Sequence, residues 1–127
     1  MNLQFTQEEL DFQKEVRDWI KENYPEDMKE RLTNAPNGHV TKEEHVQWQQ
    51  ALYAKGWAGI NWPKEYGGAA FTASQKYLFS KEMAAARAPG FTAFGVSMVA
   101  PVIMAFGSDE QKSKYLPDIL SSKVWWC

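Results

Sequence analysis

The chain is short of cysteine, and its charges do not gather by sign. Its single cysteine, Cys127, is the last of 127 residues. No disulfide can form within it, so we expect a reducing, cytoplasmic location. The first ten residues lack the basic and apolar regions of a secretory signal peptide. The net charge of −2 comes from interspersed acids and bases, which argues against nucleic acid as a partner.

Residues that commonly carry chemistry are also scarce. The two histidines, His39 and His45, lie six positions apart without cysteine partners, so we predict no metal site and two solvated or partly packed side chains. Gly67 and Gly68 follow no predicted strand, which excludes the dinucleotide-binding fingerprint. Three acidic pairs fall in expected first turns of helices, where the helix dipole favours negative charge. These pairs are Glu8–Glu9, Glu43–Glu44 and Asp109–Glu110.

A long stretch without charge runs from Ala88 to Ser108. Prolines and glycines interrupt it, which favours a buried core segment over a membrane span. Residues Phe91–Phe106 are apolar nearly all round, as expected of a helix buried in a bundle, and Pro101 should kink or divide that helix. By periodicity alone, Met98 and Met104 are core residues.

The remaining sequence predicts capped amphipathic helices. Thr6 with Glu9 and Thr41 with Glu44 have the spacing of capping boxes. The segment Trp57–Gly68 is rich in rings and glycines without helical period, and we expect an ordered loop held down by its aromatics. Helices are predicted from Thr6 to before Pro25, from Pro25 to about Leu32, over Lys42–Lys55, from Thr72 to about Arg87, over Phe91–Phe106, and from Ser108 to Leu120.

The predicted fold is an all-α bundle of about six helices over residues 1–123. Val124, Trp125 and Trp126 favour extended structure. We therefore expect residues 124–127 to begin the first strand of a missing middle β domain.

Three segments resemble the acyl-CoA dehydrogenase family. Gly56–Gly59 and Trp62–Gly68 resemble its G-W and W-P-x-E-x-G-G signature. After Pro101, Phe106–Pro117 resembles the run F/Y-G-x-x-E-Q-K-x-x-Y-L-P, the most specific marker of this half of the family. The opening Phe5-Thr6-x-Glu-Glu precedes an amphipathic helix, as in family members. The order and spacing match over essentially the whole chain.

The resemblance implies the N-terminal helical domain of an FAD-dependent enzyme that oxidises an acyl-CoA thioester at its α and β carbons. In family members a glutamate base takes the α proton, FAD accepts hydride, and an electron-transferring flavoprotein receives the electrons, in homo-oligomers or heteromers. No catalytic residue falls in this segment. Trp126 and Cys127 would lead into the FAD-binding stretch, so we expect the chain alone to be inactive and to retain no FAD.

The resemblance also implies one functional surface. The family helix that corresponds to Phe91–Phe106 lines the acyl-chain pocket, and we expect Phe94, Gly95, Met98 and Val102 to face it. Plain core packing is the alternative for each. Gly95 is small and could leave room for a long or branched acyl chain.

Two other functions stay open at this point. An acyl-CoA oxidase or a nitroalkane oxidase-like flavoenzyme would share this half of the sequence. A stand-alone helical interaction module, self-associating through exposed apolar surface, is the alternative from a different class.

Overall fold

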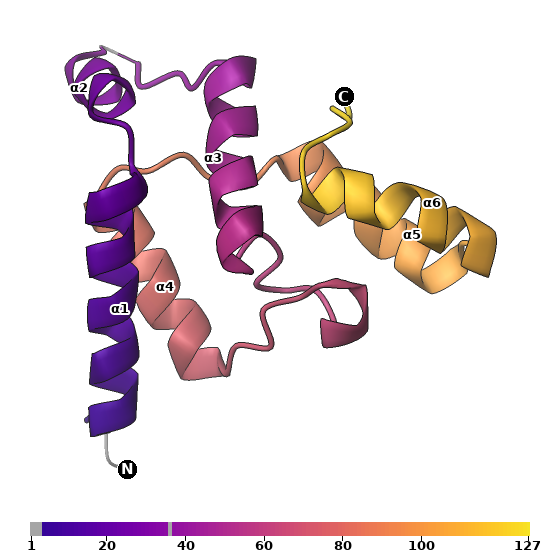
Figure 1. Cartoon of the computed structure of the whole chain (residues 1–127), viewed down its shortest axis with the longest axis horizontal. Coiled ribbons are helices and arrows are strands. Elements are labelled where there is room, and N and C mark those ends of the chain that lie inside the picture. The colour runs from indigo at the N-terminus through magenta and orange to yellow at the C-terminus, as the bar shows by residue number, and fades with distance from the viewer. Residues whose placement is uncertain (1–3, 36) are drawn as a thin grey trace. The chain divides into compact units, whose positions relative to one another are not determined.

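The computed structural model describes residues 4–35 and 37–127. These residues form six α-helices and no β-strand, which confirms the all-α prediction (Figure 1). The helices are α1 (Gln7–Asn23), α2 (Glu26–Asn34), α3 (Lys42–Lys55), α4 (Ala73–Ala85), α5 (Ala100–Phe106) and α6 (Asp109–Leu120). A 3₁₀ turn, η1 (Lys64–Tyr66), lies in the aromatic loop, and a π-helix, η2 (Ala93–Val99), precedes α5.

The helix ends follow the local sequence signals. Four helices begin with complete capping boxes, in which a hydroxyl accepts from the third backbone N–H and the third side chain accepts from the cap backbone. The capping residues are Thr6, Thr41, Thr72 and Ser108. Gly56 ends α3 in the left-handed region at φ 87°. The predicted bounds of α1, α3 and α6 are thereby confirmed.

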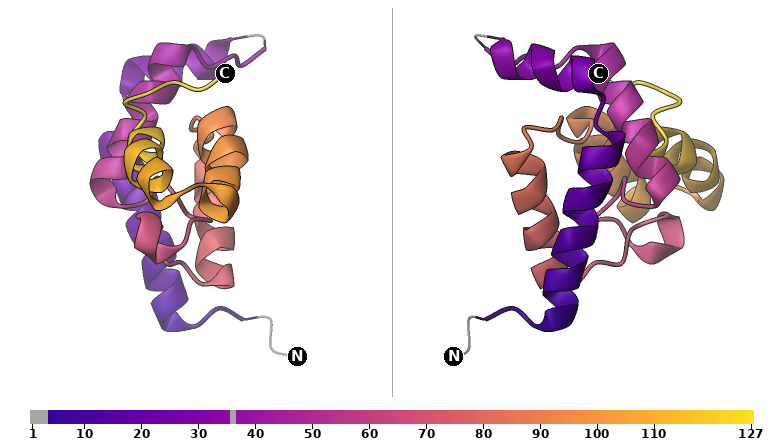
Figure 2. Two further views of the ribbon diagram at one scale, coloured as in Figure 1. Left: turned by 90° about the vertical axis from the view of Figure 1, so that its right-hand side faces the viewer. Right: turned by 60° about the vertical axis from the view of Figure 1, so that its left-hand side comes forward.

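The chain divides into two compact units. The first combines Met1–His39 with Phe71–Ala88, and the second combines Val40–Ala70 with Pro89–Cys127. In the first unit α1 and α4 run side by side (Figures 1 and 2). Phe71, just before α4, contacts rings of both helices: its centroid lies 5.0 Å from that of Phe12 in α1 and 5.7 Å from that of Phe79 in α4.

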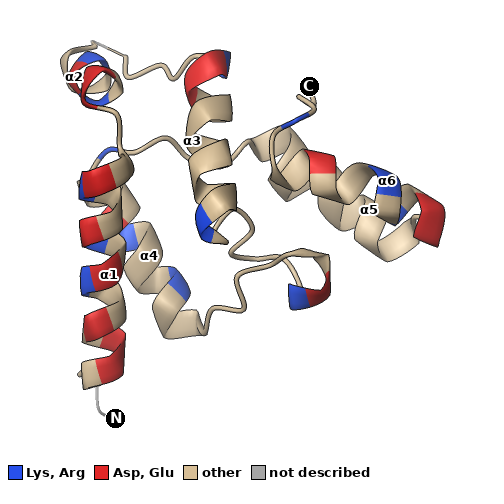
Figure 3. Cartoon of the chain, in the orientation of Figure 1, with Lys and Arg blue, Asp and Glu red and all other residues tan. Residues whose placement is uncertain are grey.

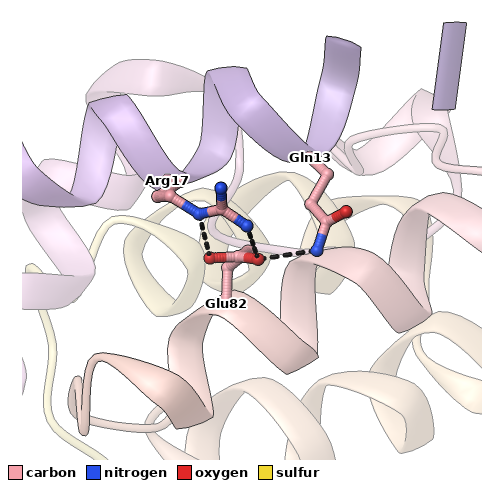
Figure 4. Close-up of polar contacts among 3 residues, drawn as sticks. All are labelled: Gln13, Arg17 and Glu82. Atoms are coloured by element: carbon pink, nitrogen blue, oxygen red, sulfur yellow. Dashed lines mark hydrogen bonds and ion pairs between the residues drawn. The ribbon is translucent and has the colours of Figure 1, made fainter. Parts of the chain in front are cut away.

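A buried carboxylate joins the same two helices. The Glu82 side chain is only 8% exposed. The Arg17 Nε donates to Glu82 Oε2 at 3.0 Å and the Arg17 Nη2 donates to Oε1 at 2.9 Å. The Gln13 Nε2 donates to the same Oε1 at 2.7 Å (Figure 4). The hydrogen bonds from Arg17 hold the pKa of Glu82 below its ordinary value of 4.5. Burial raises this pKa, but by less than the hydrogen bonds lower it.

This lowered pKa gives stability a pH dependence. The unfolded chain binds the Glu82 proton more tightly than the folded chain does, so the stabilisation is present above the ordinary pKa and is lost as pH falls through the folded value. Below about pH 4.5 the free energy of unfolding, measured with urea, should fall more steeply with pH for the wild type than for Glu82→Gln. Glu110→Gln, at the exposed start of α6, is the control, because it removes one carboxylate that is not buried. Equal pH profiles for the wild type and Glu82→Gln would contradict this assignment.

The second unit holds the aromatic loop against α3 and α6. Trp57 and Trp62 are 7% and 5% exposed, which confirms that rings hold the loop down. The buried Gln49 of α3 donates from Nε2 to the carbonyl of Leu120 at 3.0 Å and to that of Ala58 at 3.4 Å. One side chain thereby links α3, the loop and the end of α6.

The prediction of a helix over Phe91–Phe106 that Pro101 divides is confirmed, but the prediction that it is buried nearly all round was wrong. The segment is a π-helix followed by α5, with Pro101 in the first turn of α5, so the division expected at proline is present. Only one side of it is buried, where α6 packs against η2 and α5 (Figure 2). Met98 is 58% exposed, so its assignment to the core was also wrong, whereas Met104 is half-buried.

Residues 124–127 form no strand in this chain. A strand needs a neighbouring strand to accept its backbone hydrogen bonds, and the described residues offer none. The start of a β domain at Val124 therefore stays a prediction.

Candidate functional site

An exposed apolar stripe runs along η2 and α5. Its four members recur every fourth residue, and each is more than half exposed: Phe94 (55%), Met98 (58%), Val102 (56%) and Phe106 (86%). No charged residue lies between Arg87 and Asp109, and α5 accordingly carries neither blue nor red in Figure 3. Grouped exposed apolar side chains mark interaction or ligand-binding surfaces more often than isolated ones do.

Three of the four residues predicted to line a pocket belong to this stripe. The fourth, Gly95, is buried on another side of the helix. A Cβ built on Gly95 would lie 3.2 Å from Ile119 Cγ2 and 3.7 Å from Trp126 Cδ1. Gly95 therefore lets η2 approach α6 closely. The small size of Gly95 suggested open space for an acyl chain, but the neighbouring atoms of α6 and Trp126 already occupy that space.

Phe106 is the stripe residue that the sequence analysis did not include. Its signal was present, because it continues the four-residue spacing of Phe94, Met98 and Val102. A segment predicted to be buried all round gave no reason to extend the row to Phe106. Exposure, unlike periodicity, depends on which side neighbouring elements cover.

The π-helix that carries the stripe has an identifiable cause. The Ala100 N–H donates to the carbonyl of Gly95, five residues back. In this register the next donor would be residue 101, bonding the carbonyl of Val96, but proline has no N–H. The indole Nε1 of Trp62 donates to the Val96 carbonyl instead, at 2.9 Å. A buried acceptor that the helix cannot satisfy is thus satisfied by the aromatic loop.

Two small cavities lie along η2. One, of about 190 Å³, is lined by Ile60, Asn61, Trp62, Phe91, Val96, Ser97, Pro101 and Met104. The other, of about 280 Å³, is lined by Val40, Lys42, His45, Phe91, Thr92, Ala93, Phe94, Trp125 and Trp126. Of the stripe residues, Phe94 lines the second cavity and none lines the first.

The second cavity is lined by polar as well as aromatic side chains. The Lys42 ammonium lies 5.6 Å from the ring centroid of Trp125, and the His45 ring lies 6.1 Å from the same indole. His45 Nδ1 is buried without a hydrogen-bond partner. The histidine is partly packed, as predicted. Trp126 is half-buried beside Tyr115, at 6.1 Å between centroids, and Cys127 is exposed.

Within residues 4–35 and 37–127 no three His, Cys, Asp or Glu side chains gather as a metal site. No helix in that part of the chain is long and apolar enough to cross a bilayer. The stripe itself contains no acid, base or nucleophile, so it can bind and orient an apolar group but cannot move a proton.

Comparison with known proteins assigns this arrangement to a family. Residues 6–123 match the family model described as acyl-CoA dehydrogenase, N-terminal domain. Acyl-CoA dehydrogenase IpdE1 of Mycolicibacterium smegmatis is 32% identical over 92% of this chain and 31% of its own length. Acyl-CoA dehydrogenase FadE26 of Mycobacterium tuberculosis is 32% identical over 98% of this chain and 31% of its own.

Solved structures agree with the sequence matches. The Tcur3481-Tcur3483 steroid ACAD superposes with a TM-score of 0.79 at 33% identity, over 98% of this chain and 32% of that one. The ChsE4-ChsE5 complex from Mycobacterium tuberculosis gives 0.76 at 31% identity, over 98% and 30%. The chain thus spans about a third of the length of the relatives it matches.

Proposed function

The chain belongs to the acyl-CoA dehydrogenase family through its N-terminal domain, and on that premise we propose that it serves an FAD-dependent α,β-dehydrogenation of an acyl-CoA thioester in a complete enzyme. Relatives named acyl-CoA dehydrogenases support this over an acyl-CoA oxidase or a nitroalkane oxidase-like flavoenzyme. FAD, an electron-transferring flavoprotein and a cytoplasmic location are parts of the same proposal. Trp126 and Cys127 would lie next to the flavin segment.

The proposed contribution of this chain is one wall of the acyl-chain pocket. The observation that carries it is the stripe, an uncharged row of exposed side chains on η2 and α5. Phe94, Met98 and Val102 would contact the acyl chain, and Gly95 would seat the wall against Ile119. Apolar walls of this kind bind by removing apolar surface from water.

A bulky acyl group fits this proposal. One structural neighbour is named a steroid ACAD, which supports a polycyclic acyl-CoA as the substrate class. The other neighbour is named as a complex of two proteins, which supports an oligomeric enzyme. A stand-alone interaction module would instead use the same stripe to self-associate.

The test replaces a stripe residue by a polar one of similar size in the complete enzyme. Met98→Gln should raise the KM for acyl-CoA about tenfold while kcat changes less, because a polar group in an apolar pocket weakens binding of the acyl chain. Steady-state kinetics with an artificial electron acceptor measures both constants. Leu10→Gln, at an apolar position of α1 that is 43% exposed, is the matched control.

An unchanged KM in Met98→Gln would remove the pocket assignment. The 127-residue chain by itself serves as the negative control for turnover, since it contains no residue assigned to the chemistry. Flavin retention and acyl-CoA oxidation by that chain alone would overturn the division of roles proposed here. Light scattering on the same preparation tests the alternative, because a clean monomer counts against self-association through the stripe.

A further inference from the structure

The link between Trp62 and Val96 connects the aromatic loop to the stripe. Trp62 lies in the loop between α3 and α4, and Val96 lies in the middle of η2, between Phe94 and Met98. Both are buried, at 5% exposure each, and the indole N–H bonds the Val96 carbonyl at 2.9 Å. The bond is therefore shielded from water and spans two segments that are distant in sequence.

The π register decides how the stripe is aligned. A π-helix holds one more residue per turn than an α-helix, roughly. Phe94 lies inside η2, so if η2 relaxed to an α-helix, Phe94 would turn about the helix axis relative to α5. Phe94 would then leave the line it shares with Val102 and Phe106.

Pro101 and Trp62 act on the same atom. Pro101 removes the backbone donor that the Val96 carbonyl would have in the π register. Trp62 supplies a donor from the loop, so the π register leaves no buried carbonyl at Val96 without a hydrogen bond. Pro101 thus leaves the Val96 carbonyl without a backbone donor, and the Trp62 indole N–H donates to it.

The loop holds Trp62 firmly enough for this task. The backbone N–H groups of Trp62 and Ala69 both donate to the carbonyl of Gly59, each at 3.2 Å. A Cβ on Gly59 would lie 3.0 Å from the Trp62 ring, so the absence of a side chain at Gly59 lets the indole pack against this backbone. The indole is thereby fixed before it reaches η2.

We propose that Trp62 is a positioning residue for the acyl pocket: its indole N–H, bonded to the Val96 carbonyl that Pro101 leaves without a donor, holds η2 in the π register that aligns Phe94 and Met98 with Val102. The inference rests on the proposed function, because it assigns the stripe to the pocket. Trp62 does not touch the reacting atoms, and it acts through η2.

The kinetic test uses the complete enzyme and four variants. Trp62→Phe removes the donor and should raise the KM for a bulky acyl-CoA about tenfold, with a smaller change in kcat. Adding Pro101→Ala restores a backbone N–H within reach of the Val96 carbonyl, so the double variant should recover part of the loss. Trp57→Phe removes an indole from the same loop at similar burial and should leave KM unchanged. Met98→Gln reports on the pocket itself.

A second measurement does not depend on activity. In the ¹H–¹⁵N spectrum of the chain, the Trp62 indole N–H should exchange with deuterium at least tenfold more slowly than that of Trp19, which is half-buried. Benzothienylalanine at position 62 keeps the ring shape without the N–H. It provides the same kinetic comparison if Trp62→Phe folds poorly.

The outcomes separate the two proposals. A raised KM in Trp62→Phe that Pro101→Ala partly restores supports the positioning role. A raised KM in Met98→Gln with no change in Trp62→Phe or the benzothienylalanine variant overturns the positioning role and leaves the proposed function standing. No change in Met98→Gln removes the pocket assignment, and the positioning role falls with it. A rapidly exchanging Trp62 indole overturns the hydrogen bond on which the role depends.

Discussion

Replacing Gly68 by alanine should destabilise the chain by about 3 kcal/mol or more, because the new methyl group would collide with backbone. An ideal Cβ at Gly68 lies 1.8 Å from the carbonyl oxygen of Trp62, 2.5 Å from its carbonyl carbon and 2.8 Å from the carbonyl oxygen of Pro63. A flexible side chain could move aside, but these atoms belong to the tight turn that the Gly68 N–H itself closes on Pro63 at 3.0 Å. The turn must open to accept the methyl group.

Urea unfolding followed by circular dichroism measures this effect. Gly90→Ala is the matched control, because a Cβ there meets nothing within 4 Å. We expect Gly90→Ala to stay within about 1 kcal/mol of the wild type. Equal unfolding midpoints for the two variants would show that the loop yields to Gly68→Ala and that its backbone is not rigid.

Shortening Trp62 should have the second large effect, and two variants separate its parts. Trp62→Phe keeps a ring but leaves the buried Val96 carbonyl without its donor, which should cost about 1–3 kcal/mol. Trp62→Ala also opens a cavity in a position that is 5% exposed. Its total cost should be about 3–5 kcal/mol.

A double-mutant cycle with Pro101→Ala isolates the hydrogen bond. If Pro101→Ala restores a backbone donor to the Val96 carbonyl, Trp62→Phe should cost less in that background than in the wild type. Chemical denaturation of the four proteins gives the coupling free energy. Additive costs would mean that the indole N–H and the missing proline donor are unrelated, and the explanation of the π-helix would have to be given up.

Much of the local structure could be predicted from the chain. Thr6 and Thr41 mark helix starts because a hydroxyl at the cap and a carboxylate three residues later satisfy donors within one turn. Pro25 marks a helix end because proline has no N–H to continue the helix. Gly56 marks another because glycine readily adopts the left-handed conformation that ends a helix. The motif in Trp62–Gly68 likewise led to the family without any knowledge of its contacts.

The exposed stripe could be predicted only in part. Phe94, Met98 and Val102 were grouped from their spacing, and the structure does bring them onto one exposed stripe. Gly95 was predicted on the same helix face, at i+1 from Phe94, but a Cβ there would meet Ile119 of α6. The π register was not expected, since it depends on a donor from Trp62, which lies 34 residues before Val96.

The sequence by itself determined the helical class, the helix starts and stops, the absence of disulfides and the family, because each depends on groups within a few residues of one another. The tertiary structure alone decided which side of Phe91–Phe106 is covered, that Gly95 contacts α6, and that an indole bonds the Val96 carbonyl. Burial and satisfaction of a backbone acceptor depend on segments brought together by folding. The spacing along one helix cannot report them.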